Sequence, residues 1–553
     1  MFIVYSELRQ RAGKLVRTQA PEVLAERKVG LEKESLRVKG NGGISQADHP
    51  EALGAALTHP FITTDFSEAL LEMVTPPCDS AEEALHFLTS VHQFIVHRLP
   101  EGEHIWNTSM PCILRGGPSV RIGEYGSSHS GQMKHAYRRG LGLRYGRRMQ
   151  AIAGVHFNFS MPETAWPLRE SLLGADGDLD SAALRHRFDA QSSRERQLQR
   201  TNGYFQMMQN LLRVGWLVPY LFGASPAICQ SFLGEGEGEE LDVWNQSTRF
   251  AEYGTSLRMG KIGYRYSEED PIDLSVRHTD VESYIEDIIG HVSTEHPPYK
   301  ALGIRDEDGR FQQLSACRLQ IENEFYSTVR PKQIPHPGEL PIHALSERGI
   351  RYLELRSVDV NLLDPAGLNL HQIAMLEMLM MFAWLADPVP LTADEQEIST
   401  RNVKTVAHRG REPGLMLEGP DGPIALPQWG KAILDSLEPI AQWLDSDRET
   451  PLYAPALAEQ QARLADPQLT PSAQMIAGIR QTGSFFEHAQ SLSREHDAAL
   501  REAPQDEALF ARLDELVQQS RLKQAEMEAD SEGRFEDFLA AYLDQIHPRR
   551  TDG

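Results

Sequence analysis

The chain has 553 residues, 41% of them hydrophobic, so it can bury a large core and could hold two or more domains. Its 79 acidic residues outnumber its 55 basic residues and give a formal net charge of −24. This charge disfavours nonspecific attraction to nucleic acid or to an anionic membrane. An anionic substrate therefore needs local arginines or metal ions in order to bind.

The cysteines and the apolar segments predict a soluble, cytoplasmic protein. Four cysteines stand far apart without a Cys-x-x-Cys pair: Cys78, Cys112, Cys229 and Cys317. This pattern indicates neither a disulfide framework nor a zinc knuckle. The first ten residues lack the charged-then-apolar order of a signal peptide. The longest apolar run, residues 373–386, contains Glu377, so it predicts a buried helix rather than a membrane span.

The first segment with a chemical pattern is residues 30–38, where Glu32 and Glu34 stand two positions apart. In a β-strand, the period of two puts both carboxylates on one face and places Leu31 and Lys33 on the other. Two carboxylates that point the same way repel each other, and they take up protons unless a cation lies between them.

Two further segments predict strands with polar faces. Residues 70–74 put Glu72 on one face and stop at two prolines. A helix, which would bring Glu68 next to Glu72, is the alternative, but the β-branched residues and the prolines favour the strand. Residues 151–160 alternate so that His156 and Asn158 share a face. The plain interpretation of His156 is a core histidine bonded to neighbouring backbone.

Two later segments repeat this alternation. Residues 319–326 predict a strand with Glu322 and Glu324 on one face, and residues 352–359 predict one with Glu354 and Arg356 on one face. Charges also alternate on ordinary solvated strands, which is the simpler explanation for any one of these segments. Several such strands in one acidic chain make that explanation weaker.

Brought together in one sheet, these side chains form an oxygen-rich ligand set with one imidazole: Glu32, Glu34, Asp65, Glu72, Glu322, Glu324, Glu354 and His156. Such a set suits Mg²⁺ or Mn²⁺ better than Zn²⁺, which prefers several histidines or thiolates. Magnesium in turn suggests phosphates, and arginines such as Arg138, Arg258 and Arg356 can bind a phosphoryl group. Because no Walker-type loop is present, the residues alone predict phosphoryl transfer without one.

The order and spacing of several motifs resemble those of the proteobacterial type of glutamate-cysteine ligase. The resemblance runs from about residue 10 to about residue 530, and its motifs lie at residues 30–37, 63–72, 154–160, 218–229, 319–326 and 352–359. It implies an α+β fold of the glutamine-synthetase-like type, a curled, mainly antiparallel sheet with helices outside. We expect a catalytic domain over residues 1–430 and a mainly helical region over residues 431–553 that packs on it.

The resemblance also implies an activity, which composition cannot show. It is the ATP- and magnesium-dependent joining of the glutamate γ-carboxylate to the cysteine amine through γ-glutamyl phosphate, the first step of glutathione biosynthesis. The implied partners are the small molecules glutamate, cysteine and ATP, with no nucleic acid and no membrane, and the implied state is a monomer.

Position by position, the resemblance assigns roles to single residues. The implied metal ligands are Glu32, Glu34, Asp65, Glu72, His156 and Glu354. The implied catalytic residues are Arg138, Arg258 and Arg356, of which Arg138 and Arg356 also bind the nucleotide. The implied substrate pocket contains Tyr137, Leu141, Tyr264, Tyr326 and Arg258.

Three alternatives stay open. A related carboxylate-amine ligase would use another amine acceptor. A metal-dependent hydrolase would use water and need no ATP, but it would require more nitrogen ligands. A noncatalytic acidic interaction protein would keep its function after loss of Glu32 or Arg356.

Overall fold

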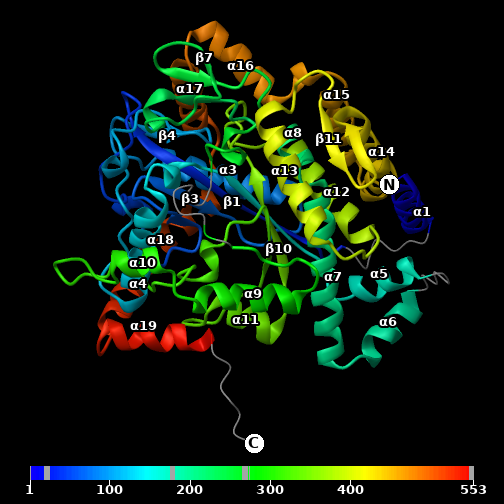
Figure 1. The fold of residues 1–553 in the computed structure, drawn as a ribbon, viewed down its shortest axis with the longest axis horizontal. Coiled ribbons are helices and arrows are strands. Elements are labelled where there is room, and N and C mark those ends of the chain that lie inside the picture. The colour runs from blue at the N-terminus through cyan, green and yellow to red at the C-terminus, as the bar shows by residue number, and fades with distance from the viewer. Residues whose placement is uncertain (1, 18–24, 175–180, 264–271, 273, 547–553) are drawn as a thin grey trace, which may run out of the picture.

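The structure, a computed structural model of the chain, describes residues 2–17, 25–174, 181–263, 272 and 274–546. At its centre lies a sheet surrounded by helices (Figure 1). In the described residues this sheet has seven antiparallel strands, in the order β2-β3-β1-β5-β10-β9, with β4 paired to the end of β1. The strands are β1 (Lys28–Lys39), β2 (Ile62–Thr64), β3 (Leu70–Val74), β4 (Glu103–Trp106), β5 (Val155–Ser160), β9 (Val329–Lys332) and β10 (Tyr352–Val358).

Strand β1 is a central strand of the sheet because it pairs with β3, β4 and β5. Behind it, the buried Lys33 donates a hydrogen bond of 2.7 Å to Asn107 Oδ1, so this lysine has a partner on the far face from Glu32 and Glu34. The predicted strands at β1, β3, β5 and β10 are confirmed. The alternation of their residues was therefore a reliable signal of sheet faces.

The predicted strand at residues 319–326 is wrong. Residues Glu322–Glu324 form a 3₁₀ turn, η6, because their side chains bond to local and distant backbone. The Glu324 carboxylate accepts from the Gln320 amide at 2.7 Å, and the Glu322 carboxylate accepts from the Ile342 amide at 3.1 Å. The spacing of the two glutamates therefore reflects a turn rather than a strand face.

Helices cover the sheet. Those before residue 350 are α1 (Phe2–Arg17), α3 (Ala81–Val96), α4 (His129–Tyr145), α5 (Ala165–Leu173), α6 (Ser181–Ala190), α7 (Ser193–Val214), α8 (Leu217–Phe222), α9 (Val281–Ser293), α10 (Pro297–Leu302) and α11 (Pro341–Arg348). Helix α3 begins as capping chemistry requires, since the Ser80 hydroxyl accepts from the Glu83 amide. Two small sheets lie apart from the central one. The first is formed by β6 (Ala227–Cys229), β7 (Asp242–Val243) and β8 (Thr248–Phe250), and the second by β11 (Met416–Gly419) and β12 (Gly422–Ala425).

The later helices are α12 (Leu370–Leu385), α13 (Ala393–Arg409), α14 (Leu426–Leu444), α15 (Tyr453–Ala465), α16 (Pro471–Thr482), α17 (Phe485–Glu502), α18 (Glu507–Ala529) and α19 (Phe535–Leu543). Helix α12 is the expected buried helix and contacts α3, α7, α14 and α15. Helix α14 packs on α1, α17 packs on β4, and α19 packs on α4. Residue 430 falls inside α14, and the expected division of the chain near this residue stays a prediction.

The cysteine pattern gives no sign of a disulfide framework, yet one pair of cysteines is joined. Cys112 and Cys229 are joined, with their Cα atoms 5.3 Å apart across 117 residues of sequence. Cys78 and Cys317 are free. Sequence spacing could not reveal the pair, because the tertiary fold alone brings these two segments together.

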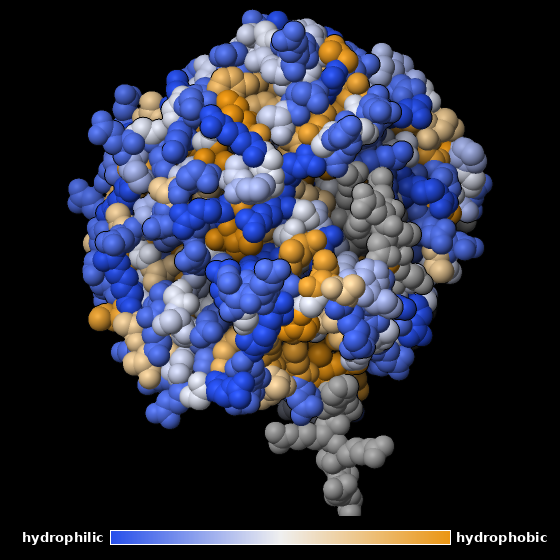
Figure 2. Space-filling model, turned by 60° about the vertical axis from the view of Figure 1, so that its left-hand side comes forward, coloured by the Kyte–Doolittle hydropathy of each residue, from blue (hydrophilic) through white to orange (hydrophobic). Residues whose placement is uncertain are grey.

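The outer surface agrees with the composition. Hydrophilic side chains cover most of the face shown in Figure 2, as expected for a chain with a net charge of −24. Among the helices that the structure describes, none combines the length and the apolar character that a membrane crossing requires.

Candidate active site

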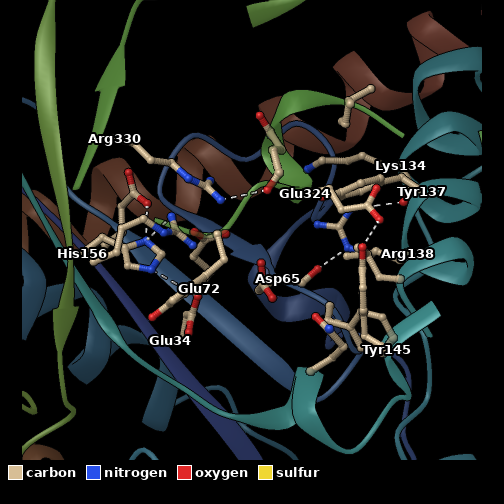
Figure 3. A pocket seen from close by; sticks show the side chains of 18 of the residues that line it. Glu34, Asp65, Glu72, Lys134, Tyr137, Arg138, Tyr145, His156, Glu324 and Arg330 are labelled. Atoms are coloured by element: carbon tan, nitrogen blue, oxygen red, sulfur yellow. Dashed lines mark hydrogen bonds and ion pairs between the residues drawn. The ribbon is translucent and has the colours of Figure 1, made fainter. Parts of the chain in front are cut away.

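One face of the central sheet forms the floor of a cavity of about 430 Å³. Strands β1, β3, β5 and β10 supply four of its carboxylates, its imidazole and one arginine, while α4 forms the facing wall. Asp65, just after β2, and Glu324, in η6, supply two further carboxylates. Figure 3 shows this arrangement, with Glu34, Glu72 and His156 at one end, Asp65 in the middle, and α4 at the other end. The cavity therefore has a charged floor and a mixed wall.

The strand register gathers the charged side chains. Glu34 on β1 lies opposite Glu72 on β3, and Glu32 on β1 lies opposite His156 on β5. Glu354 on β10 joins them from the other side of β5. Side chains directly opposite on neighbouring antiparallel strands lie within about 5.5 Å at Cβ, so the sheet itself concentrates these groups.

His156 is at the centre of this cluster. Its Nδ1 lies 3.0 Å from Glu32 Oε2 and 3.7 Å from Glu354 Oε1, and its Nε2 lies 3.7 Å from Glu34 Oε1. Ligand atoms of Glu32, Glu72 and His156 all lie within 4.8 Å of one another. The alternative interpretation of His156, a core histidine with a backbone partner, does not describe this environment.

The carboxylates of this cluster are not all balanced by cations. Burial, together with the charges of Asp65 and Glu72, raises the pKa of Glu34 well above its usual value. Burial and the charges of Glu32 and Asp65 raise the pKa of Glu72 to about 8. By contrast, Lys332 and Arg356 lower the pKa of Glu354 against the opposing effect of burial. Without a bound cation, the carboxyl groups on the β1–β3 side of the cluster therefore tend to keep their protons.

The donor atoms fit a hard divalent cation. The buried Glu354 Oε2 has no hydrogen-bond partner and lies 3.6 Å from Lys332 Nζ. Carboxylate oxygens dominate the set, as Mg²⁺ prefers, and a cation between Glu34 and Glu72 would relieve the repulsion that raises their pKa values. Glu32, Glu34, Asp65, Glu72, His156 and Glu354 all line the cavity.

Two of the predicted arginines face the cavity. Arg356 Nη1 donates to Glu354 Oε1 at 3.1 Å and lies 3.4 Å from His156 Nδ1. Arg138 on α4 donates to the Asp65 carbonyl and to the Lys134 carbonyl. Arg258 is buried but is not among the residues that line the cavity. It lies behind the floor, where its Nη2 donates to the Arg356 carbonyl at 2.6 Å.

One side of α4, with polar, charged and apolar side chains, forms the wall of the cavity. Lys134, Tyr137, Arg138, Leu141 and Tyr145 follow the three- and four-residue spacing of one helix side, and all five line the cavity. Tyr326 lies on the cavity wall too, and its hydroxyl donates to Met259 Sδ at 3.4 Å. Tyr137, Leu141 and Tyr326 are therefore brought together as predicted, whereas Tyr264 lies outside the described residues.

Several cavity residues escaped the sequence analysis. Lys134, Arg330, Lys332 and Tyr542 all line the cavity. Lys134 stands one helical turn before Arg138, and Arg330 and Lys332 alternate along β9, so helix and strand periodicity could have indicated these three. Tyr542 on α19 had no comparable signal, because packing of α19 on α4 brings it to the cavity.

The family of the chain follows from comparison with known proteins. The profile described as glutamate-cysteine ligase matches residues 13–406. The chain belongs to the glutamate-cysteine ligase family. A glutamate-cysteine ligase of Azotobacter vinelandii is 41% identical over 518 residues, 94% of each chain. That of Pseudomonas paraeruginosa is 40% identical over 522 residues, also 94% of each chain.

Solved structures give the same result. The crystal structure of the glutamate-cysteine ligase of Francisella tularensis in complex with AMP matches with a TM-score of 0.84 and 31% identity, over 94% of this chain and 97% of that one. A bifunctional glutathione synthetase of Pasteurella multocida matches with a TM-score of 0.66 and 25% identity, over 89% of this chain and 55% of that one. The predicted family, fold class and enzyme class, a ligase, are confirmed.

The reaction of the glutamate-cysteine ligase family explains why the cavity contains both carboxylates and cationic side chains. The family's reaction is ATP-dependent formation of γ-glutamylcysteine in glutathione biosynthesis, as the sequence motifs predict. Such a reaction brings together polyanions and an amine. The cavity offers carboxylates fit for cations at one end, and arginine, lysine and tyrosine side chains at the other.

Proposed function

We propose that this chain joins the γ-carboxylate of glutamate to the amine of cysteine inside this cavity, at the expense of ATP. The observation that carries the proposal is the cluster of carboxyl groups with raised pKa values between β1 and β3, next to Arg356 and facing the cationic and aromatic wall of α4. A nucleotide and glutamate are both anionic, so this end of the cavity can receive them only with cations.

We assign Glu32, Glu34, Asp65, Glu72, His156 and Glu354 as the residues that hold Mg²⁺. When bound, Mg²⁺ neutralises phosphate oxygens and makes the γ-phosphorus of ATP a better electrophile. Without it, each carboxylate–phosphate charge pair at 4 Å would repel by about 4 kcal/mol at an effective dielectric of 20. The need for several cations follows from the number of carboxylates on the floor.

The chain's own residues orient the two chemical steps. In the first, the glutamate γ-carboxylate attacks the γ-phosphorus of ATP, which gives γ-glutamyl phosphate and ADP. In the second, the cysteine amine attacks the acyl carbon, loses a proton, and phosphate leaves. Arg356 and Arg138 face the cavity as guanidinium groups that can hold the transferred phosphoryl oxygens.

We assign the cysteine side chain to the wall formed by Tyr137, Leu141 and Tyr326. These side chains offer an apolar surface next to hydroxyl groups, which suits a small thiol. A thiol and a methyl group are similar in size, so discrimination against 2-aminobutyrate is worth only about 1–3 kcal/mol. We therefore expect the enzyme to accept 2-aminobutyrate in place of cysteine.

Release of ADP tests the proposal directly. Purified protein is assayed with ATP and Mg²⁺, with glutamate and cysteine each omitted in turn, and the ligated product is identified by mass spectrometry. We expect rapid ADP release only in the complete mixture and γ-glutamylcysteine as the product. Turnover with other amines but not with cysteine would identify a different carboxylate-amine ligase, and ATP-independent hydrolysis would overturn the proposal.

The cytoplasmic location and the monomeric state are also proposals. The first rests on the scarcity of cysteine, and cell fractionation tests it. The second is tested by light scattering, for which a monomer gives a mass of 62.1 kDa.

A further inference from the structure

A buried ion pair lies directly behind the floor of the cavity. Asp359 follows β10, the strand that contributes Glu354 and Arg356, and it has no exposed surface. Its Oδ1 lies 3.7 Å from Nη1 of Arg258, a side chain that is only 1% exposed. Neither residue lines the cavity, so any effect of this pair on the reaction passes through the groups that they contact.

Asp359 is held by a dedicated set of donors. Its Oδ2 accepts from the Ala224 amide at 2.9 Å and from the Ser225 hydroxyl at 2.6 Å, and its Oδ1 accepts from the Ser256 hydroxyl at 2.9 Å. Ser225 and Ser256 also form a parallel bridge. The segment 218–229, one of the family motifs with no role assigned so far, therefore fixes the position of this carboxylate.

Arg258 in turn contacts the backbone that supports the floor. Its Nη2 donates to the Arg356 carbonyl at 2.6 Å. A Cβ atom at Gly154 would lie 2.1 Å from the same Nη2, so the guanidinium packs directly on this glycine. Only glycine permits so close an approach.

Gly154 connects this contact to a predicted metal ligand. Its amide donates to Glu34 Oε2 at 2.7 Å, and its carbonyl accepts from the Glu34 amide at 3.0 Å. Movement of Arg258 would therefore shift both the donor that orients the Glu34 carboxylate and the backbone carbonyl of Arg356.

We propose that Asp359 is a positioning residue, which holds Arg258 against Gly154 and the Arg356 carbonyl and so fixes Glu34 and Arg356 for the reaction. The inference rests on the proposed function, because it gives a task to the floor of that same site. The competing explanation is that Asp359 only neutralises a buried arginine and stabilises the fold. The two explanations differ in what they predict for kinetics and for Mg²⁺ binding.

The test begins with Asp359→Asn, which keeps the shape and removes the charge. We expect kcat/KM for glutamate to fall by about 100-fold, the size of effect that a small misplacement of a catalytic group produces. We also expect that more Mg²⁺ is needed to reach half of the Mg²⁺-induced rise in Tm, a readout that does not require turnover. Unchanged kinetics and Mg²⁺ response in the folded variant would overturn the proposal.

A double-variant cycle separates positioning from folding. If Asp359 acts through Arg258, then Asp359→Asn lowers kcat/KM by about 100-fold in the wild-type background and by less than about 3-fold in an Arg258→Ala background. Equal factors in both backgrounds would overturn the proposal. An inactive wild-type protein that still shows the Mg²⁺-induced rise in Tm would instead count against the proposed function.

Gly154→Ala approaches the same contact from the other side. The added methyl group must displace the Arg258 guanidinium while Asp359 stays intact, so we expect the kinetic signature of Asp359→Asn, and a wild-type kcat/KM would overturn the proposal. This variant also serves if Asp359→Asn does not fold. The control is Glu377→Gln, which removes the charge of an equally buried carboxylate that is paired with Arg27 and does not line the cavity. We expect this control to lower Tm and leave kcat/KM of the folded protein unchanged.

Discussion

Two buried carboxylates, Glu377 and Glu34, stand in opposite electrostatic situations. Glu377 on α12 is paired with Arg27 Nε at 3.1 Å and with the Tyr453 hydroxyl at 2.8 Å. Glu34 on β1 has the Gly154 amide as a hydrogen-bond donor, but Asp65 and Glu72 help to raise its pKa. The first carboxylate has the partners it needs inside the chain, whereas the second lies beside two further carboxyl groups that help to raise its pKa.

The difference separates groups that serve the fold from groups that serve a ligand. Removing one partner of a satisfied buried pair leaves an uncompensated charge and destabilises the protein. Removing one member of a repelling cluster relieves repulsion and costs function instead. Substitution of Glu377 is therefore expected to lower stability and leave activity unchanged. Substitution in the carboxylate cluster of the cavity is expected to lower activity and leave stability unchanged or raise it.

The largest expected effect belongs to Glu72→Gln. The variant loses one predicted ligand, and we expect kcat to fall by about 1,000-fold, equivalent to about 4 kcal/mol. Because burial and the neighbouring carboxylates raise the pKa of Glu72 to about 8, the amide replaces a mostly protonated carboxyl group at neutral pH, and we expect Tm of the metal-free protein to stay the same or to rise. ADP release and a thermal melt in a chelator measure the two quantities. A lower Tm together with full activity would place Glu72 among the groups that serve the fold.

The opposite outcome is expected for Glu377→Gln. Loss of this charge leaves Arg27 buried beside a neutral amide, and we expect a loss of about 3 kcal/mol in the free energy of unfolding. Urea denaturation measures it, and kcat per folded molecule is expected to stay at the wild-type value. A fall in kcat with unchanged stability would show that Glu377 serves activity rather than the fold, so that it does not differ from Glu34 in this respect.

A buried histidine extends the comparison to pH. His59 Nδ1 accepts from the Phe61 and Ile62 amides at 3.2 and 2.9 Å, and burial lowers the pKa of His59 to about 4. Between this pKa and the unfolded value of about 6.5, the unfolded chain binds more protons, so stability falls as the pH is lowered. We expect a loss of about 2 kcal/mol between pH 7 and pH 5 from this group.

The variant His59→Asn tests that expectation, because the amide oxygen can accept the same backbone hydrogen bonds but does not titrate. Urea denaturation at pH 7 and pH 5 should show a smaller loss of stability in the variant than in the wild type. Identical losses would show that His59 is not the source of this pH dependence.

The smallest effect is expected at the apolar wall. Leu141→Ala enlarges the proposed cysteine pocket by a few methylene-sized groups, and we expect KM for cysteine to rise by about 10-fold. The preference for cysteine over 2-aminobutyrate is expected to fall while KM for glutamate stays constant. Initial rates at varied concentrations of each substrate measure these constants. An increase in KM for glutamate alone would show that this wall binds glutamate rather than cysteine.

The sequence predicted much of the floor of the cavity but less of its surroundings. Alternation along the strands placed Glu32, Glu34, Glu72, His156 and Glu354 on common faces, and each of them lines the cavity. The same signal failed at Glu322 and Glu324, because alternation cannot distinguish a strand from a turn whose side chains bond to nearby backbone. Local pattern is informative where hydrogen bonding between strands determines the direction of the side chains.

Other features had no local signal at all. The bond between Cys112 and Cys229 joins residues 117 positions apart. Tyr542 reaches the cavity from the last helix described, and Arg258, which the family motifs place at the substrate, lies behind the floor against Gly154. Each of these depends on packing between segments that are distant in the chain.

The sequence by itself therefore determined the family, the reaction and the polar faces of the strands, since each depends on residue types and short-range spacing. Only the tertiary structure decided which charges are balanced. Glu34 and Glu377 are both buried glutamates, and residue type alone does not distinguish their electrostatic states. The distinction arises because the fold brings Arg27 to one carboxylate and Glu72 to the other.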